Sequence, residues 1–253
     1  MYAKHRNRQG KTITDGFTLM ELLVVISIIV IVTALTLTGI KKMIQSANKA
    51  VAIRNISQLQ VANAGYASEN NGKFMPVYAF DKDSKIATMW FCSSSFLDYL
   101  GGGGSLLKSM NNENTVPINM MDPVVVRAKK YKYDSYDASF GYNHEGIDGS
   151  YWGNPNAERS FRMQQIAFPA RSAAFLTATD WIAKYDGRFA WQGAGAVEGK
   201  TIDGKIAFRH GGKALVVYYD GHVGEITMDD LKKIDSGSDP KGDKNIFWNA
   251  DGL

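Results

Sequence analysis

The sequence predicts an α+β fold in which a long amino-terminal α-helix, membrane-spanning over its first half, packs on an antiparallel β-sheet head. An uncharged apolar run occupies residues 22–40, and an amphipathic pattern continues from it to about residue 70. Short β-like runs separated by turns then follow. The chain therefore divides into a leader over residues 1–16, a transmembrane and stem helix over 17–72 and a globular head over 73–253.

The composition is that of an ordinary globular chain, with 45% hydrophobic and 21% charged residues among 253. The net charge of +4 belongs mostly to the leader, which carries four basic side chains and one acidic one in 16 residues. The remainder is nearly balanced, with 25 basic and 24 acidic side chains, so nothing indicates a nucleic-acid surface. The single cysteine, Cys92, excludes an intrachain disulfide.

The apolar run is long enough to cross a membrane. Its 19 residues extend roughly 28 Å as a helix, at ~1.5 Å per residue, against a bilayer core of about 30 Å. Twelve of the residues from Leu22 to Leu37 are Leu, Ile or Val, and they outweigh the cost of Glu21 beside the run. A secretory signal cut after Ala34 is the alternative, but the long polar leader and the length of the run argue against it.

The leader followed by "GFTLMELLVVISIIVIV" (residues 16–32) resembles the prepilin amino terminus of type IV pilins and type II secretion pseudopilins. The resemblance implies that a prepilin peptidase cuts after Gly16 and methylates the new amine of Phe17. Glu21 is then the fifth residue of the mature chain and takes part in filament assembly.

Elementary electrostatics explains why an acid is useful at Glu21. Cleavage creates a cation at Phe17, and residues four apart share a helix face. A positive amine opposes the helix macrodipole, which a nearby carboxylate offsets. In a filament, Glu21 of one subunit can neutralise the amine of a neighbour, because a buried charge is tolerated only when it is paired. An accidental acid at the membrane interface is the other interpretation.

The resemblance also implies a location and a set of partners. The chain is expected in the inner (cytoplasmic) membrane as a single-pass protein, with a periplasmic or extracellular head, or assembled into a filament. Its expected partners are the membrane, the prepilin peptidase, other pilin-like subunits and the assembly platform of a secretion or pilus system. Four basic residues lie on each side of the apolar run, so charge alone does not fix the orientation.

The helix is predicted to continue from about Phe17 to Asn70. "ENNGK" (residues 69–73) supplies a carboxy-terminal stop, with Gly72 suited to a left-handed cap. The apolar side chains beyond the membrane run approximate one helical stripe. They are Ile44, Ala47, Val51, Ile56, Leu59, Ala62 and Tyr66.

The head is predicted to be rich in strands. The expected strands are "PVVVRA" (123–128), "SFGYN" (139–143), "SAAFLTAT" (172–179), "KIAFR" (205–209), "ALVVYY" (214–219) and "HVGEI" (222–226). "TMDDLKKI" (227–234) predicts a short helix that opens at Thr227.

The strongest pattern in the head places nine residues between His210 and Asp220-Gly221. It is similar to the His-x9-Asp-Gly processing-associated module at the carboxy end of many prepilin-like proteins. Asp220-Gly221 between two apolar runs predicts a two-residue hairpin turn, which makes His210, Asp220 and Gly221 structural. The alternative is a metal or catalytic site built from His210, Asp220 and His222, with Asp180 as a further member.

No zinc-ligand spacing and no nucleophile elbow accompanies these residues, so we expect no catalytic residue, no metal and no cofactor, and the chain is not expected to be an enzyme. A calcium loop is the other open possibility. Asp235, Asp239 and Asp243 offer oxygen ligands, but an EF-hand register places Pro240 at its glycine position. A solvated acidic loop is the simpler interpretation.

Two functions compete with a filament subunit. A membrane-tethered binding module would use exposed aromatic side chains of the head, such as Trp152, Trp181 and Trp191, to hold a polysaccharide or a protein. A surface hydrolase is the other possibility.

Overall fold

The computed structural model describes residues 16–80, 87–101, 106–108, 114–128, 139–143, 160–183, 191–192, 204–236 and 244–250. The chain divides into two compact units, Met1–Ile44 and Gln45–Leu253, and the division falls inside the first helix. Helix α1 runs from Leu19 to Glu69 and is 51 residues long. The second unit therefore includes the second half of this helix.

The part of α1 in the first unit exposes its apolar side chains, from Leu22 at 52% to Ile40 at 51%. Several of its hydroxyl side chains donate hydrogen bonds to the backbone of the helix. The hydroxyls of Ser27 and Thr33 each donate to the carbonyl four residues earlier, both at 2.7 Å. By length and composition the helix can cross a membrane, as the sequence predicts.

The part of α1 in the second unit is a core element. Its buried face begins at Ala52 and continues through Ile56, Leu59 and Ala62. The predicted stripe starts too early, because Ile44 is 42% exposed and Ala47 is also exposed. Three amide side chains share the buried face, namely Asn55, Gln60 and Asn63.

Helix α1 ends as the "ENNGK" pattern predicts. Asn71 (φ 54°) and Gly72 (φ 77°) are both left-handed, and the Gly72 amide donates to the Ala67 carbonyl at 2.8 Å. A bond of this span closes a left-handed helix terminus. The predicted glycine is present, and Asn71 adds a second left-handed residue before it.

The main sheet has five strands in the order β11-β10-β6-β5-β7. Their bounds are Val223–Thr227 (β11), Lys213–Tyr218 (β10), Ala173–Thr177 (β6), Phe140–Asn143 (β5) and Ile182–Ala183 (β7). Most pairs are antiparallel, but β5 and β7 run parallel, so the prediction of a purely antiparallel sheet is wrong. The reason is that the chain reverses direction after β6. Strand β7 then pairs with the edge of β5 that faces away from β6, and it runs in the same direction as β5.

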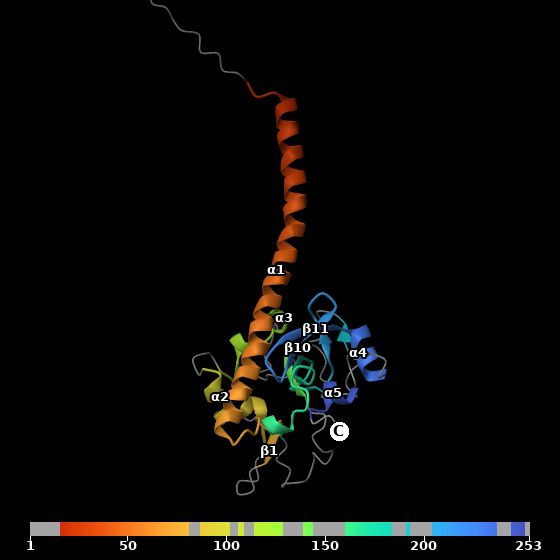
Figure 1. The fold of residues 1–253 in the computed structure, drawn as a ribbon. Helices are drawn as coiled ribbons and strands as arrows, with labels where there is room; N and C mark the ends of the chain where they lie inside the picture. The colour runs from red at the N-terminus through yellow and green to blue at the C-terminus, as the bar shows by residue number, and fades with distance from the viewer. Residues whose placement is uncertain are drawn as a thin grey trace, which may run out of the picture. The chain divides into compact units, whose positions relative to one another are not determined.

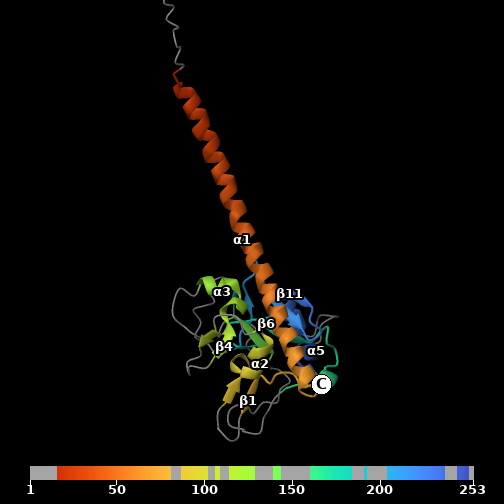
Figure 2. The same ribbon diagram turned by 90° about the vertical axis from the view of Figure 1, so that its left-hand side faces the viewer.

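The sheet lies between two helical layers (Figures 1 and 2). Alternate side chains of β10 face opposite ways, as a pleated strand requires. Leu215 and Val217 join the cluster that contains α1, whereas Val216 joins the cluster that contains helices α4 and α5. Helix α4 is Met228–Ser236 and helix α5 is Lys244–Trp248.

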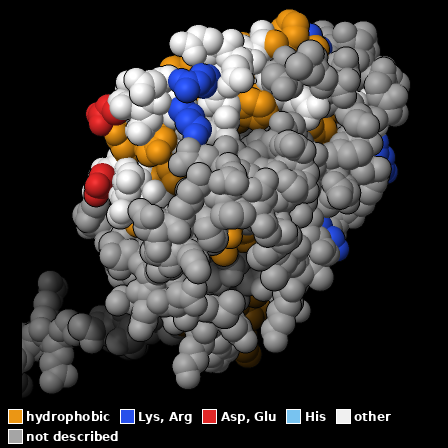
Figure 3. Space-filling model, turned by 90° about the horizontal axis from the view of Figure 1, so that it is seen from below, with side chains coloured by type: hydrophobic (Ala, Val, Ile, Leu, Met, Phe, Trp, Pro, Cys, Tyr) orange, Lys and Arg blue, Asp and Glu red, His pale blue; other side chains and the backbone are white. Residues whose placement is uncertain are grey.

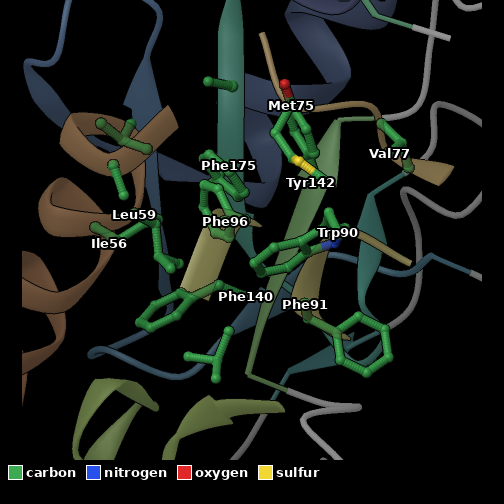
Figure 4. Close-up of a cluster of buried hydrophobic side chains, with 14 of the residues drawn as sticks. Ile56, Leu59, Met75, Val77, Trp90, Phe91, Phe96, Phe140, Tyr142 and Phe175 are labelled. Atoms are coloured by element: carbon green, nitrogen blue, oxygen red, sulfur yellow. The ribbon is translucent and has the colours of Figure 1, made fainter. Parts of the chain in front are cut away.

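The larger cluster contains many aromatic rings, and Trp90 contacts several of them (Figure 4). The Trp90 ring lies 5.3 Å from that of Phe175 and 5.8 Å from that of Phe96, in edge-on geometry. Its indole nitrogen donates to the Trp181 carbonyl at 2.7 Å. Ile56 and Leu59 of α1 enter the same cluster, so the helix and the sheet share one core.

Five of the six predicted strands are present in whole or in part, but "PVVVRA" is helix α3, Pro123–Ala128. Asp122 begins it, because its side chain accepts the Val124 amide at 2.9 Å. An Asp at the cap and a Pro in the first turn are both helix-start signals. Together they prevail over the β-propensity of the three valines, and Val125 is fully buried.

Helix α4 opens as predicted. The Thr227 amide and hydroxyl donate to Asp230 Oδ2 at 2.9 and 2.6 Å, and the Asp230 amide donates back to Thr227 Oγ1 at 3.1 Å. This is a capping box with an aspartate in the acidic position.

The remaining described elements lie around this frame. They are the two-stranded pairs β1 (Tyr78–Phe80) with β2 (Ala87–Met89), β3 (Leu106–Lys108) with β4 (Asn114–Pro117), and β8 (Trp191–Gln192) with β9 (Ala207–Phe208), the helix α2 (Ser94–Tyr99), and the 3-10 turns η1 (Trp90–Cys92), η2 (Ile118–Met120) and η3 (Met163–Gln165).

Candidate functional site

The predicted cleavage site lies just before α1. Gly16 and Phe17 precede the helix, and the Phe17 side chain is 74% exposed. No atom lies within 4 Å of the position that a Cβ would take on Gly16. Within the described residues, the bond between Gly16 and Phe17 is therefore open to an enzyme.

Glu21 closes a capping box with Thr18. The Thr18 amide and hydroxyl donate to Glu21 Oε2 at 2.9 and 2.8 Å, and the Glu21 amide donates back to Thr18 Oγ1 at 3.2 Å. The box satisfies donors that the first turn of a helix leaves open. Sequence reasoning missed Thr18, although Thr-x-x-Glu before an apolar run is the signature of this arrangement.

His210 is buried and contacts an acid that is remote in sequence. Its Nε2 lies 3.0 Å from Asp122 Oδ2, and the relative exposures of the two side chains are 2% and 0%. The other oxygen, Oδ1, begins helix α3. One carboxylate thereby ties the start of β10 to the start of α3.

Arg209 completes this buried cluster. Its Nη1 lies 3.8 Å from Asp122 Oδ2, and its guanidinium donates to the carbonyls of Ser139 and Ala178 at 3.0 and 2.7 Å. Burial lowers the pKa of Arg209 to about 10, and the charge of Asp122 opposes that shift. The guanidinium therefore stays charged at neutral pH and balances the buried Asp122.

The predicted hairpin joins β10 and β11, but its loop is one residue longer than predicted. Val217 pairs with Val223, and the Tyr218 amide donates to the His222 carbonyl at 3.0 Å. The loop is thus Tyr219-Asp220-Gly221, of which only Gly221 has positive φ, at 93°. A three-residue loop of this kind needs one left-handed residue at its end, so Asp220 keeps an ordinary φ.

A two-residue turn with two left-handed positions does occur, at the other end of β10. Gly211 and Gly212 have φ of 66° and 80°, and His210 and Lys213 exchange backbone hydrogen bonds across them. The His-x9-Asp-Gly pattern therefore spans strand β10 and both of its turns.

The residues of the alternative metal site do not meet. His210 and His222 lie at opposite ends of β10, about 20 Å apart for six strand residues. His222 Nδ1 contacts Asp220 Oδ1 at 2.6 Å on the surface, and Asp180 accepts the amides of Trp181 and Gly204. Among the described residues, no group of three His, Cys, Asp or Glu side chains could hold a metal.

The structure describes only some residues of two other expected sites, the surface aromatics of the alternative binding function and the calcium loop. Trp181 is 6% exposed, so it is a core residue and not a surface aromatic of the alternative binding function. Trp152 lies outside the described residues, as do Asp239 and Asp243 of the calcium loop.

Gly221→Val should lower the free energy of unfolding by about 1–3 kcal/mol, because valine is strained at a left-handed φ. No atom lies within 4 Å of the added Cβ, so the cost comes from the backbone and not from a clash. The measurement is chemical denaturation of the full chain in detergent, followed by tryptophan fluorescence. Gly221→Asn is the matched control, since asparagine tolerates the left-handed region better. Equal stability of both variants would contradict the assigned backbone conformation.

An ion-pair group fixes α1 to the edge of the sheet. Lys49 Nζ lies 2.5 Å from Glu225 Oε1, and Lys213 Nζ lies 3.2 Å from Glu225 Oε2. The hydrogen bond from Lys49 is the main cause of a lowered pKa at Glu225, and Lys213 adds to it.

Glu225 should make stability depend on pH in the acid range. Because its pKa is lower in the folded chain than the ordinary 4.5, its contribution is present above that value and is lost as pH falls through the folded pKa. Glu225→Gln should destabilise the neutral protein by about 0.5–1 kcal/mol, since the pair is partly exposed. The difference from wild type should vanish in acid. Unfolding curves between neutral and acid pH measure it, and a constant difference would contradict this assignment.

Comparison with protein-family models, curated proteins and solved structures found no match for this chain.

Proposed function

We propose that the chain is a pilin-like structural subunit of a type II secretion pseudopilus or a type IV pilus-like filament. It is cut after Gly16 and methylated on the new amine of Phe17. The observation that carries the proposal is the amino-terminal segment, in which an accessible Gly-Phe pair precedes a helix whose first turn holds one carboxylate. That helix exposes apolar side chains up to Ile44.

The exposed helix needs an apolar environment. Side chains such as Val30, Leu35 and Leu37 are 66%, 69% and 57% exposed within the chain, and exposed apolar surface on this scale marks a membrane or protein contact. Lipid supplies that contact before assembly, and the helices of neighbouring subunits supply it in a filament. The transfer of a subunit from the membrane into the filament is then mechanical work, in which no covalent bond is made or broken.

The capping box gives Glu21 a defined place in this process. Both hydrogen bonds that Thr18 donates to the carboxylate use Oε2, and Oε1 accepts no hydrogen bond from the described residues. A neighbouring subunit's amine can approach Oε1 while Thr18 holds Oε2. The carboxylate is thus oriented before it meets a cation, which reduces the entropy lost on pairing.

The direct test of processing is the intact mass of the mature chain. We expect a chain that starts at Phe17 and carries one methyl group. A retained leader, or a chain cut after Ala34, would contradict the proposal.

Glu21→Leu should insert normally into the membrane, because it removes a cost to insertion, and should lose most filament assembly. Glu21→Gln is the matched variant, since glutamine keeps the capping box with Thr18 and removes only the charge. If charge pairing drives assembly, both variants should fail in electron microscopy of sheared filaments. Recovery by Gln alone would show that capping is the whole role of Glu21. Normal filament yield from both variants would count against the pairing argument, whereas a wild-type chain that forms no filament would favour the alternative, a membrane-tethered binding module that does not polymerise.

A further inference from the structure

An open pocket lies between the end of α1 and helix α2. Its volume is about 390 Å³, within the range of small-ligand sites. Six residues line it, namely Tyr66, Glu69, Asn70, Ser95, Asp98 and Tyr99. All six belong to the second unit.

Two tyrosine rings shape the pocket. Tyr66 and Tyr99 have centroids 6.1 Å apart at an interplanar angle of 75°. The absence of a side chain at Gly65 permits this approach, because a Cβ there would lie 3.1 Å from Tyr99 Cδ1. The Tyr99 hydroxyl also donates to Glu69 Oε2 at 2.5 Å. The ring and the carboxylate thus hold each other in place.

The lining is negatively charged. Glu69 and Asp98 are acidic, and none of the six lining side chains is basic. Within the described part of the chain, neither carboxylate forms an ion pair. The hydrogen bond to Glu69 raises the pKa of Tyr99 to about 12, so the phenol stays protonated and remains a donor. The carboxy-terminal end of α1 adds the negative pole of its macrodipole.

We propose that this pocket binds the cationic end of a lysine or arginine side chain presented by a partner protein. Two carboxylates supply the opposite charge, and the two aromatic rings supply cation–π attraction. A divalent metal ion suits the pocket poorly, because Ca²⁺ requires about six to eight oxygen ligands and the described residues contain no metal-holding group of acids.

The position of the pocket suits contact with another protein. Figure 3 views the molecule from below, and the described part of this surface shows acidic side chains beside hydrophobic ones, with basic side chains close by. Ser95 and Asp98 are exposed, so a side chain entering from solvent meets no barrier from them. Aromatic rings beside acidic groups favour an amphipathic side chain that carries an apolar stem and a charged tip.

The test uses the full chain in detergent and three capped amino acids, namely N-acetyl methylamides of lysine, arginine and norleucine. Ligand-observed NMR should show millimolar binding of lysine or arginine and at least tenfold weaker binding of norleucine, which has the stem without the charge. The dissociation constant should rise with salt. Equal binding of norleucine, or no binding of either basic compound, would overturn the proposal.

Variants locate the site. Asp98→Asn and Glu69→Gln should each weaken binding of the basic compound by threefold or more. Asp229→Asn is the control, because Asp229 is an exposed acid of α4, away from the six lining residues, and should bind as wild type does. Equal weakening by Asp229→Asn would show a general charge effect and would overturn the assignment to this pocket.

Discussion

Gly141→Ala is expected to destabilise the protein by about 3 kcal/mol or more, because the added methyl group would overlap backbone atoms of the neighbouring strand. An added Cβ would lie 2.5 Å from both the carbonyl carbon and oxygen of Ile182, and 2.9 Å from the Ala178 Cβ. Two of these contacts are with backbone atoms of β7, which cannot rotate away. The substitution therefore separates β5 from β7 or prevents this edge of the sheet from forming.

Chemical denaturation of the full chain in detergent, followed by tryptophan fluorescence, measures the loss. Gly39→Ala is the matched control, since the same methyl group there meets no atom within 4 Å and Gly39 lies inside α1. Alanine is a better helix former than glycine, so the control should be neutral or slightly stabilising. If Gly141→Ala were as stable as the control, β7 could not lie as close to β5 as the coordinates place it.

Asn63→Leu should cost about 2–4 kcal/mol, because it leaves several buried polar groups without partners. Asn63 Nδ2 donates to the Tyr142 hydroxyl at 3.1 Å and to Gln60 Oε1 at 3.2 Å, and its Oδ1 accepts the Met75 amide at 3.0 Å. Leucine has similar bulk, so packing is nearly kept while the hydrogen bonds are lost. Denaturation of the full chain again gives the measurement.

Two further variants isolate the cause. Gln58→Leu, on the exposed side of the same helix, should change stability by no more than about 0.5 kcal/mol. Asn63→Leu combined with Tyr142→Phe should be less destabilising than the sum of the two, since both act on one hydrogen bond. Strict additivity of the pair would mean that Asn63 and Tyr142 do not interact.

Asn63 belongs to a set of amide side chains that hold α1 against the head. Asn55 Nδ2 donates to the Asn119 and Met121 carbonyls, both at 2.8 Å, and Gln60 Nε2 donates to the Tyr219 carbonyl at 2.9 Å. These bonds fix the rotation of the helix about its axis and its position along that axis. The contacts of an apolar stripe alone would not define either quantity. Tyr219 stands in the β10–β11 loop, so the same set also holds the hairpin.

Local chemistry in the sequence was enough to predict the elements that depend on neighbours along the chain. The length of the apolar run predicted the helix, and "ENNGK" predicted its left-handed end at Gly72, to which the structure adds Asn71. "TMDDLKKI" predicted a helix that opens at Thr227, where the structure shows a capping box with Asp230. These features are determined by residue propensities and by hydrogen bonds between residues a few positions apart. Distant parts of the chain therefore have little influence on them.

Local patterns failed where two local signals compete. Three valines predicted a strand at residues 123–128, but Asp122 and Pro123 start a helix there. Asp-Gly predicted a two-residue turn, but the pairing of Val217 with Val223 sets a loop of three. In the first case the local helix-start signals prevailed over the valines. In the second case the register of the two strands set the length of the loop.

Only the tertiary structure assigned partners to the buried polar groups. His210 contacts Asp122 across 88 residues, and Asn63 meets Tyr142 across 79. The parallel pairing of β7 with β5 is likewise set by the path of the chain after β6 and not by the composition of either strand. A side chain's type states that it needs a partner when it is buried, whereas the fold alone determines which remote group is brought within reach.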